Sequence, residues 1–255
     1  MAELITTTKN KTYKYIRSLL QKKYRAENMR YTVEGIKSVR DAMAAAAPVE
    51  LIAVAESFDS SELLWDIPYV TIRDDIFGGL CDTKTPQGII AVIKMRDNTQ
   101  YTCDPDKLYI YCDGVSDPGN LGTIIRTADA AGFGGVLLSN GCTDLYSPKT
   151  VRSSMGSFFN VDTVTGFTHE RLAQLKESGF TLFCGALSAD SIDYREPDYS
   201  KPSVLVVGNE ANGASDEILG ISTHIIIPIY GKAESLNAAV AASIMMYEAG
   251  ERRHG

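Results

Sequence analysis

The sequence predicts an α/β protein in which a parallel-sheet domain forms the C-terminal half and a smaller α/β domain precedes it. In the second half, short apolar runs rich in β-branched residues alternate with helical segments, which is the pattern of a parallel sheet covered on both faces. The first half also alternates strand-like and helical segments. A polar stretch containing Pro105 lies between the halves. We therefore predict domains at 1–95 and 107–255, joined by a linker at 96–106.

The first domain is expected to begin with an amphipathic helix over about residues 10–25, because Ile16, Leu19 and Leu20 recur at helical spacing. A second helix should end in the alanine-rich stretch before Pro48. The β-rich runs predict four strands and one further helix. The strands are Tyr31–Val33, Glu50–Ala55, Tyr69–Ile72 and Ile89–Ile93, and the helix is Ser61–Trp65.

The second domain shows the stronger pattern, with five predicted strands and three predicted helices. The strands are Leu108–Cys112, Gly135–Leu138, Thr181–Ala186, Val204–Val207 and Ile225–Ile229. The helices cover about residues 120–131, 168–177 and 236–248. Because ligands bind beyond the carboxyl ends of parallel strands, we expect the functional loops to follow Cys112, Val207 and Ile229.

The composition argues against several classes of protein. No apolar run approaches the ~18 residues that a membrane span needs, and the polar N-terminus lacks the apolar core of a secretory signal. We therefore expect a cytoplasmic protein without membrane contact. The five cysteines contain no C-x-x-C pair and the three histidines form no cluster, so we expect no metal site and no nucleophilic triad.

The positive charge of the chain is concentrated at its N-terminus. Residues 1–30 carry eight cationic and two acidic side chains, whereas the whole chain has a net charge of −7. Tyr13, Tyr15 and Tyr24 are interleaved with the cations and could stack on unpaired bases. Charge alone also fits a solvated helix face, but together with the motifs below it favours RNA. The predicted RNA-binding residues are Lys9, Lys11, Lys14, Arg17, Lys22, Lys23 and Arg25.

Each of the three expected loops carries an unusual sequence. The first reads Asp113-Gly-Val-Ser-Asp-Pro-Gly-Asn120 and leads into a helix containing Arg126. The second, Val206-Val-Gly-Asn-Glu-Ala-Asn-Gly213, contains glycines that allow the backbone to approach a ligand closely. The third, Ile227-Pro-Ile-Tyr-Gly-Lys-Ala-Glu-Ser-Leu-Asn237, opens the last helix, with Ser235 as the predicted N-cap. Taken singly, each loop is also compatible with an ordinary turn, and Arg126 with a surface ion pair to Asp129.

In order and spacing, these segments resemble the SpoU/TrmH family of RNA ribose 2′-O-methyltransferases in the SPOUT superfamily. The resemblance covers about residues 107–250. Two further segments, Tyr31-Thr-Val-Glu-Gly35 and Thr85-Pro-Gln-Gly88, resemble the substrate-binding domain of that family less specifically.

The resemblance implies a deep trefoil knot, S-adenosylmethionine as the methyl donor without a metal, and a homodimer. It also implies a set of site residues. Those implied to bind the donor are Gly208, Ile227 and Leu236, with Gly213 and Gly231 in the same loops. Those implied to line the catalytic site are Asn120, Arg126, Glu210, Ser235 and Asn237.

The chemistry constrains the roles of these residues. A ribose hydroxyl is a poor nucleophile, so a group must accept its proton or stabilise the alkoxide. An arginine rarely gives up its proton, so we expect Arg126 to hold the target phosphate and stabilise the alkoxide. We expect Glu210 to orient Arg126 or Asn120, and Ser235 and Asn237 to cap the last helix and tie the loops together.

Several alternatives remain at this point. Relatives with two domains mostly modify large-subunit ribosomal RNA, which favours that substrate, while others act on transfer RNA. The chain could instead be a non-catalytic RNA-binding protein that keeps the knot, or a methyltransferase acting on a base. A nucleotide-dependent dehydrogenase is disfavoured because the G-x-G-x-x-G fingerprint is missing.

Overall fold

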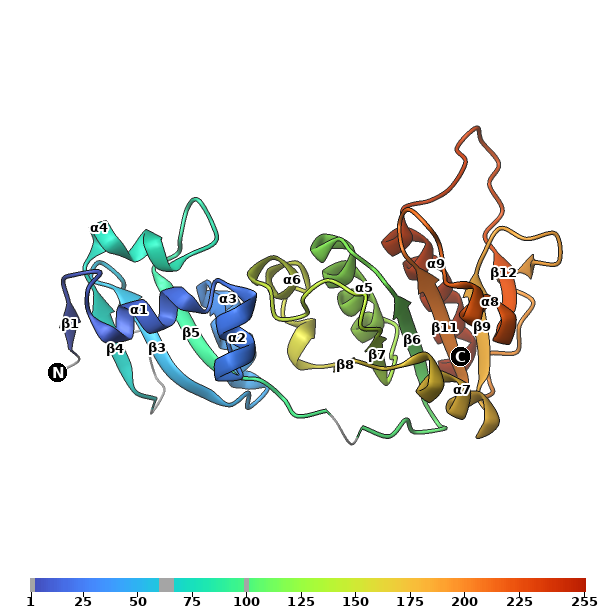
Figure 1. Ribbon diagram of the computed structural model, residues 1–255, viewed down its shortest axis with the longest axis horizontal. Coiled ribbons are helices and arrows are strands. Elements are labelled where there is room, and N and C mark those ends of the chain that lie inside the picture. The colour runs from blue at the N-terminus through green and yellow to red at the C-terminus, as the bar shows by residue number, and fades with distance from the viewer. Residues whose placement is uncertain (1–2, 60–66, 99–100) are drawn as a thin grey trace. The chain divides into compact units, whose positions relative to one another are not determined.

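The computed structural model describes residues 3–59, 67–98 and 101–255. The chain divides into two compact units. The first consists of Met1–Arg96 together with Tyr146–Phe159, and the second of Asp97–Leu145 together with Asn160–Gly255. Each unit is built on its own sheet (Figure 1).

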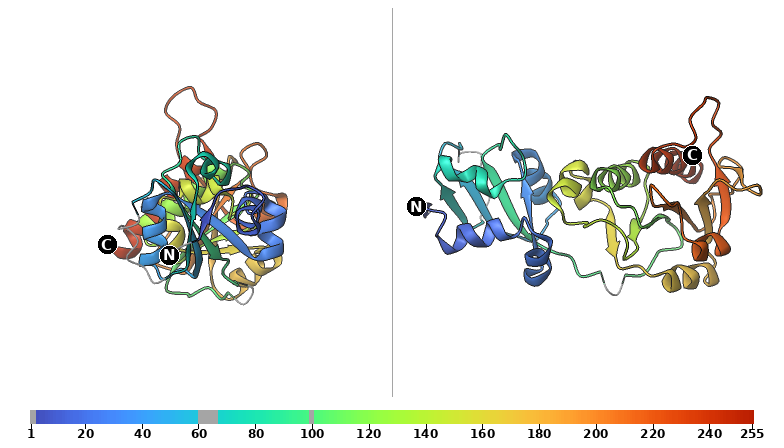
Figure 2. Two further views of the ribbon diagram at one scale, coloured as in Figure 1. Left: turned by 90° about the vertical axis from the view of Figure 1, so that its left-hand side faces the viewer. Right: turned by 45° about the horizontal axis from the view of Figure 1, so that its top comes forward.

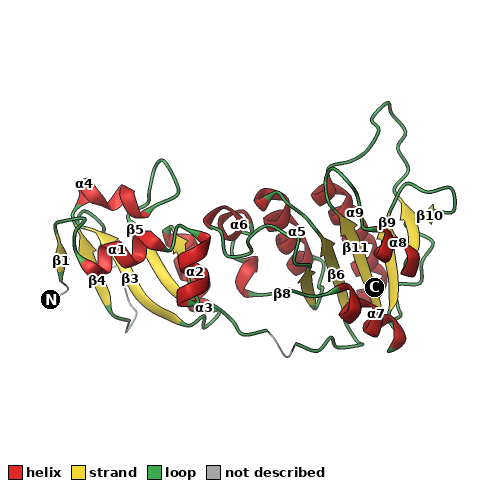
Figure 3. Ribbon diagram, in the orientation of Figure 1, coloured by secondary structure: helices red, strands yellow, loops and turns green. Residues whose placement is uncertain are grey.

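The first unit contains a mixed five-stranded sheet with the strand order β1-β4-β3-β5-β2 (Figure 3). The strands are β1 (Leu4–Ile5), β2 (Arg30–Glu34), β3 (Val49–Ala55), β4 (Tyr69–Ile72) and β5 (Ile89–Lys94). Strand β4 is parallel to β1 and β3, and β5 is antiparallel to β2 and β3. The four strands predicted for this half are therefore present, and the two-residue β1 is an addition at the edge.

The predicted N-terminal helix is two helices, α1 (Lys11–Ser18) and α2 (Lys22–Asn28). The Asn10 side chain caps α1 by accepting hydrogen bonds from the amides of Thr12 and Tyr13. The chain then turns at Leu19, whose amide bonds to the carbonyl of Ile16. This break buries Ile16 and Leu19 and lets α2 take a new direction.

Three further short helical elements lie in the described part of this unit before the chain crosses to the second. They are α3 (Ile36–Ala44), α4 (Asp74–Phe77) and the 3-10 turn η2 (Gly78–Leu80). Helix α3 occupies the place of the predicted second helix. The helix predicted at Ser61–Trp65 lies outside the described residues.

The segment Tyr146–Phe159 returns to the first unit from the middle of the chain. It forms α6 (Pro148–Ser153) and the 3-10 turn η3 (Ser157–Phe159). The rings of Tyr146 and Phe158 pack on Tyr31 of β2, with centroid distances of 4.9 Å and 5.6 Å. The Arg96 guanidinium also donates to the carbonyl of Phe159 at 2.9 Å.

The second unit contains the predicted parallel sheet, with seven strands in the order β10-β12-β9-β11-β6-β7-β8. They are β6 (Leu108–Asp113), β7 (Gly135–Leu138), β8 (Asp162–Thr165), β9 (Thr181–Gly185), β10 (Ile192–Asp193), β11 (Ser203–Gly208) and β12 (Thr223–Ile226). All neighbouring strands in this sheet run parallel, which confirms the fold class. Strand β12 ends at Ile226, three residues earlier than predicted.

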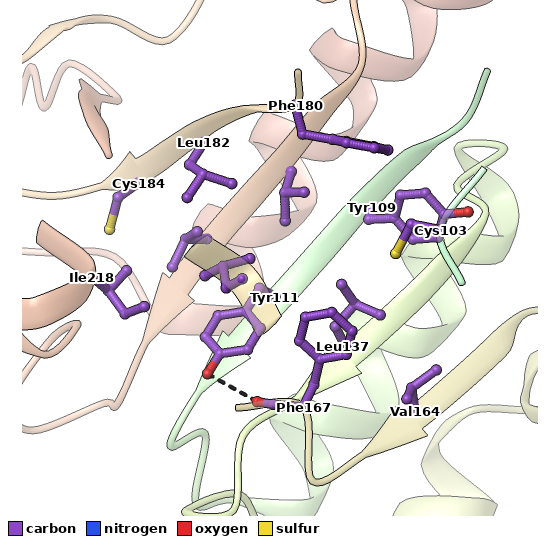
Figure 4. Close-up of a cluster of buried hydrophobic side chains, with 13 residues drawn as sticks. Cys103, Tyr109, Tyr111, Leu137, Val164, Phe167, Phe180, Leu182, Cys184 and Ile218 are labelled. Atoms are coloured by element: carbon purple, nitrogen blue, oxygen red, sulfur yellow. Dashed lines mark hydrogen bonds between the residues drawn. The ribbon is translucent and has the colours of Figure 1, made fainter. Parts of the chain in front are cut away.

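Two pairs of helices cover the opposite faces of this sheet (Figure 2). One pair is α5 (Pro118–Ala130) and α9 (Ala238–His254), and the other is α7 (His169–Glu177) and α8 (Asp216–Ile221). Figure 4 shows the core on the second face, where the Tyr111 hydroxyl donates to the carbonyl of Phe167 at 3.3 Å. In this sheet the carboxyl ends of β6 and β11 lie side by side, with Asp113 opposite Gly208.

All five cysteines are free thiols. Within residues 3–59, 67–98 and 101–255, none of the helices has both the length and the apolar character needed to cross a bilayer.

Candidate functional site

Three loops meet beyond the carboxyl ends of β6, β11 and β12, as the strand pattern predicted. Glu210, in the loop after β11, reaches across to the loop after β6. Its carboxylate accepts hydrogen bonds from the Ser116 amide at 3.0 Å, the Ser116 hydroxyl at 2.8 Å and the Asn120 side-chain amide at 2.8 Å. The Asn237 side chain, in the loop after β12, donates to the Asn120 Oδ1 at 3.0 Å. A continuous chain of hydrogen bonds therefore joins the three loops.

The electrostatics of Glu210 follow from these contacts. Burial raises the pKa of its carboxyl, but the hydrogen bonds from Asn120 and Ser116 outweigh burial and lower the pKa to about 2. The group is therefore an anion at neutral pH, and its oxygens are already occupied by donors. Glu210 is therefore better suited to orienting Asn120 than to accepting a proton in the reaction.

The loop after β11 is a tight turn. The amide and carbonyl of Asn209 pair with those of Gly213, with both N···O distances at 2.9 Å. The Asn209 side chain donates to the carbonyl of Gly114 at 2.8 Å, which anchors the turn to the loop after β6. Gly213 has a φ of +73°, a region that favours glycine. A Cβ atom on Gly208 would overlap the backbone of Gly213 and Ala214, so the turn depends on glycine at both positions.

A cavity of about 470 Å³ lies against this turn and the loop that precedes α9. Figure 1 shows that this last loop extends away from β12 before the chain enters α9. The lining combines apolar side chains with backbone groups and a few polar side chains. It includes Gly185, Leu187, Gly208, Asn209, Glu210, Gly213, Ala214, Ile225, Ile227, Ile229, Ser235, Leu236 and Met245.

The structure brings most of the predicted site residues together at this cavity. Four of the five residues implied to bind a donor line it, namely Gly208, Gly213, Ile227 and Leu236. Glu210 and Ser235 also line it, and Asn120 and Asn237 are linked to Glu210 by the hydrogen bonds described above. Gly231 and Arg126 lie outside this lining. Arg126 is exposed on α5, about one and a half turns beyond Asn120.

The predicted N-cap of the last helix is corrected by the structure. Asn237 and not Ser235 caps α9, because the Asn237 Oδ1 accepts hydrogen bonds from the amides of Ala239 and Val240 at 2.9 Å and 3.2 Å. The same side chain donates to Asn120. Asn237 therefore both starts the helix and ties two loops together.

The predicted RNA-binding surface needs one further correction. Six of its cations, Lys9, Lys11, Lys14, Arg17, Lys22 and Lys23, are exposed on or next to α1 and α2. Arg25 is only 4% exposed, and its guanidinium donates to the carbonyl of Leu19 at 2.7 Å, so it supports the turn between the helices. Tyr13 is also buried and donates to the carbonyl of Ile76, so its ring is not available for stacking.

Sequence reasoning missed a second polar cluster beside the turn. The Asp113 carboxylate, at the end of β6, accepts hydrogen bonds from the Ser215 amide at 2.8 Å. It also lies 3.1 Å from the Nε2 of His169, whose Nδ1 is 2.7 Å from the Glu217 carboxylate. No motif links these residues, and only their position at strand and helix ends could have drawn attention to them. Among the described residues, no group of three or more His, Cys, Asp or Glu side chains is placed to hold a metal ion.

Comparison with known families assigns both halves of the chain. Residues 107–247 match the SpoU rRNA Methylase family, and residues 10–91 match the MRM3-like substrate binding domain. The first match contains all three loops of the site.

Curated relatives and solved structures extend the similarity over the whole chain. The 23S rRNA (guanosine(2553)-2′-O)-methyltransferase RlmP of Bacillus subtilis is 36% identical, and the alignment covers 95% of this chain and 97% of RlmP. The tRNA (guanosine(18)-2′-O)-methyltransferase of Aquifex aeolicus is 37% identical, but the alignment covers only 57% of this chain and 70% of the Aquifex enzyme. The crystal structure of an AdoMet-bound rRNA methyltransferase from Sinorhizobium meliloti has a TM-score of 0.88 and 33% identity, covering 99% of this chain and 98% of that one. The chain therefore belongs to the SpoU rRNA methylase family.

Proposed function

We propose that the chain transfers a methyl group from S-adenosylmethionine to a ribose 2′-hydroxyl of structured RNA, with ribosomal RNA as the substrate. The observation that carries this proposal is the hydrogen-bonded chain Glu210–Asn120–Asn237 beside the cavity, in a member of this family. Ribosomal RNA is favoured over transfer RNA because RlmP and the Sinorhizobium enzyme, which both match nearly the full chain, are named rRNA methyltransferases. The Aquifex tRNA enzyme matches little more than half of the chain.

The cavity suits S-adenosylmethionine. Its volume of about 470 Å³ lies within the range of roughly 300–1,000 Å³ that is common for small-molecule sites. Gly208 and Gly213 line the cavity without side chains, so backbone amides and carbonyls there could bind a nucleoside, while Ile227, Leu236 and Met245 offer apolar surface. When bound, the donor supplies a methyl group on a positively charged sulfur, which leaves as a neutral thioether.

The polar residues have roles that follow from their positions. Asn120 and Asn237 are held in one orientation by Glu210 and by the first turn of α9. Arg126 is exposed on the same helix as Asn120. Its guanidinium stays charged, so it would bind the target phosphate and stabilise the developing alkoxide. The hydroxyl proton would then leave through that phosphate or through water.

The test is transfer of labelled methyl from S-adenosylmethionine to unmodified ribosomal and transfer RNA, followed by alkaline digestion. A 2′-O-methyl group blocks cleavage, so the label should appear in a resistant dinucleotide of ribosomal RNA. Arg126→Ala should abolish this transfer and leave donor affinity nearly unchanged. Arg252→Ala, which removes an exposed arginine paired with Glu248, serves as the matched control and should stay active.

Each other outcome of the methyl-transfer experiment would support a different function or a different role for Arg126. Label in a mononucleotide would indicate base methylation, and resistant label only in transfer RNA would move the substrate to that class. Donor binding without transfer to either RNA would indicate an RNA-binding protein that no longer catalyses. A parallel loss of donor affinity and activity in Arg126→Ala would overturn the role given to Arg126.

We also propose that the protein is a homodimer. Helix α9 carries Val240 and Tyr247 with 47% and 57% of their surface exposed, and Ile244 lies between them on the same face at helical spacing. A second copy could cover this apolar stripe. Light scattering during gel filtration measures the mass directly. The trefoil knot and the cytoplasmic location implied at the sequence level stay predictions.

A further inference from the structure

The cluster of Asp113, His169 and Glu217 holds the far end of the loop that lines the cavity. Asp113 is 8% exposed and uses both carboxylate oxygens. Its Oδ2 accepts from the Ser215 amide, which directly follows Ala214 of the cavity lining, and its Oδ1 faces the Nε2 of His169. The near end of the same loop is held separately by the Asn209 side chain on Gly114. Gly213 is held by its backbone pairing with Asn209, so it is the position of Ala214 and Ser215 that depends on the Asp113 carboxylate staying in place.

His169 bridges two acids from different elements. It is the first residue of α7, and its ring lies between Asp113 at the end of β6 and Glu217 in the first turn of α8. Only an imidazolium carries an N–H on both nitrogens and can donate to both carboxylates. After loss of the proton, one ring nitrogen presents a lone pair to a carboxylate oxygen, and that contact becomes repulsive.

The surroundings of His169 favour the charged ring. The hydrogen bond with Glu217 raises the pKa of His169 above its ordinary value of 6.5, burial opposes this, and Asp113 raises the pKa further. Burial raises the pKa of Asp113, but the hydrogen bonds from Ser215 and His169 outweigh it, so that pKa lies below its usual value. From β6 the ring of Tyr111 also faces His169, at a centroid distance of 6.2 Å. From β9, burial raises the pKa of the Cys184 thiol near Asp113 to about 12, so it is neutral.

We propose that His169 is a positioning residue for donor binding: its imidazolium, held between Asp113 and Glu217, fixes the Ala214–Ser215 end of the cavity loop, so that donor affinity decreases when the ring loses its proton. This inference rests on the proposed function, because it concerns the same cavity. The direction of this pH dependence follows from the raised pKa of His169. The stabilising contacts are complete below about pH 6.5 and are lost as the pH rises through the pKa of His169 in the folded protein.

The experiment measures the Kd of S-adenosylmethionine by calorimetry from about pH 6 to about pH 9. Between these limits the affinity of the wild type should fall roughly three- to tenfold more than that of His169→Gln, the effect of losing one typical hydrogen bond at a partly exposed site. Comparing the two proteins at each pH cancels the titration of the ligand itself. His254→Gln is the matched control, because His254 is exposed near the end of α9, and it should follow the wild type.

A second variant separates positioning from simple structural support. Glu217 is exposed, so Glu217→Gln should fold, and it removes the largest cause of the raised pKa. The midpoint of the affinity loss should then move to lower pH, and so should the midpoint of the His169 ring signal in NMR without donor. If His169→Gln keeps the pH dependence of the wild type, or if Glu217→Gln leaves the midpoint unchanged, the inference is wrong while the proposed function stands. If the wild type does not bind donor at any pH, the proposed function fails and this inference fails with it.

Discussion

At the scale of single residues, the hydrogen bonds of Glu210 both stabilise the folded protein and hold the loops of the site together. Its carboxylate accepts hydrogen bonds from Ser116, Asp117 and Asn120. A glutamine side chain has one oxygen that accepts hydrogen bonds, where the carboxylate has two. Glu210→Gln should therefore lower the free energy of unfolding at neutral pH by about 1 kcal/mol, a value that already allows for screening by solvent. Because its pKa is about 2 when folded and 4.5 ordinarily, this contribution is present above pH 4.5 and is lost as the pH falls towards 2.

Urea unfolding of wild type and variant at neutral pH and at about pH 3.5 checks this expectation. The difference between the two proteins should be smaller at the lower pH. Glu234→Gln is the control, because Glu234 also lines the cavity but is exposed in the last loop, and it should leave stability unchanged. Equal differences at both pH values would show that the charge of Glu210 does not carry the effect.

At the same scale, the structure shows which predicted site residues lie together and which contacts sequence reasoning missed. Motif matching predicted one catalytic group, Asn120, Arg126, Glu210, Ser235 and Asn237. Within the described residues the structure joins Asn120, Glu210 and Asn237 of this group by hydrogen bonds. Asp113 and His169 were missed as partners because they lie 56 positions apart and meet only through the packing of α7. Arg25 was assigned to RNA because counting charges does not show the turn that buries it.

At the scale of elements, the central strands of both sheets were predictable, whereas the edge strands β1, β8 and β10 were not. Strands such as β6 and β11 are buried on both faces and read as continuous apolar runs. The edge strand β8 has the sequence Asp-Thr-Val-Thr, with exposed ends, and gave no such signal. The apolar run after β12 suggested a strand to Ile229, but Pro228 has no amide for the ladder, and the chain leaves the sheet there to line the cavity.

The turn after β11 gives a prediction at this scale. Gly208→Ala should displace the backbone of Gly213 and Ala214, since the added Cβ overlaps it. Donor affinity should fall at least about tenfold, the equivalent of about 1.4 kcal/mol. Calorimetry measures this. Gly220→Ala in α8 is the matched control, because its Cβ would meet nothing within 4 Å and alanine favours a helix. If Gly208→Ala binds donor like the wild type, the close approach at Gly208 is not needed for the site.

At the scale of the whole molecule, the chain crosses between its two units three times. The segment Tyr146–Phe159 belongs to the first unit, although it lies within the sequence that matches the SpoU family. No sequence pattern indicated this, because Tyr146 and Phe158 fall in a polar stretch without helical or strand periodicity. Their partner Tyr31 lies more than a hundred positions earlier, and single-sequence periodicity is blind to such pairs.

This arrangement predicts that β2 and the returning segment open as one cooperative unit. Tyr31 is buried between Tyr146 and Phe158, so Tyr31→Ala should cost about 3 kcal/mol of local stability. In native-state hydrogen exchange, protection should fall together in Arg30–Glu34 and Tyr146–Phe159, while the amides of α9 keep theirs. Tyr69→Ala is the control, because Tyr69 lies in the same sheet with 38% of its surface exposed and should change little. Loss of protection confined to Arg30–Glu34 would mean that the returning segment is held by its other contacts, such as the ion pair between Arg152 and Asp82 at 3.0 Å.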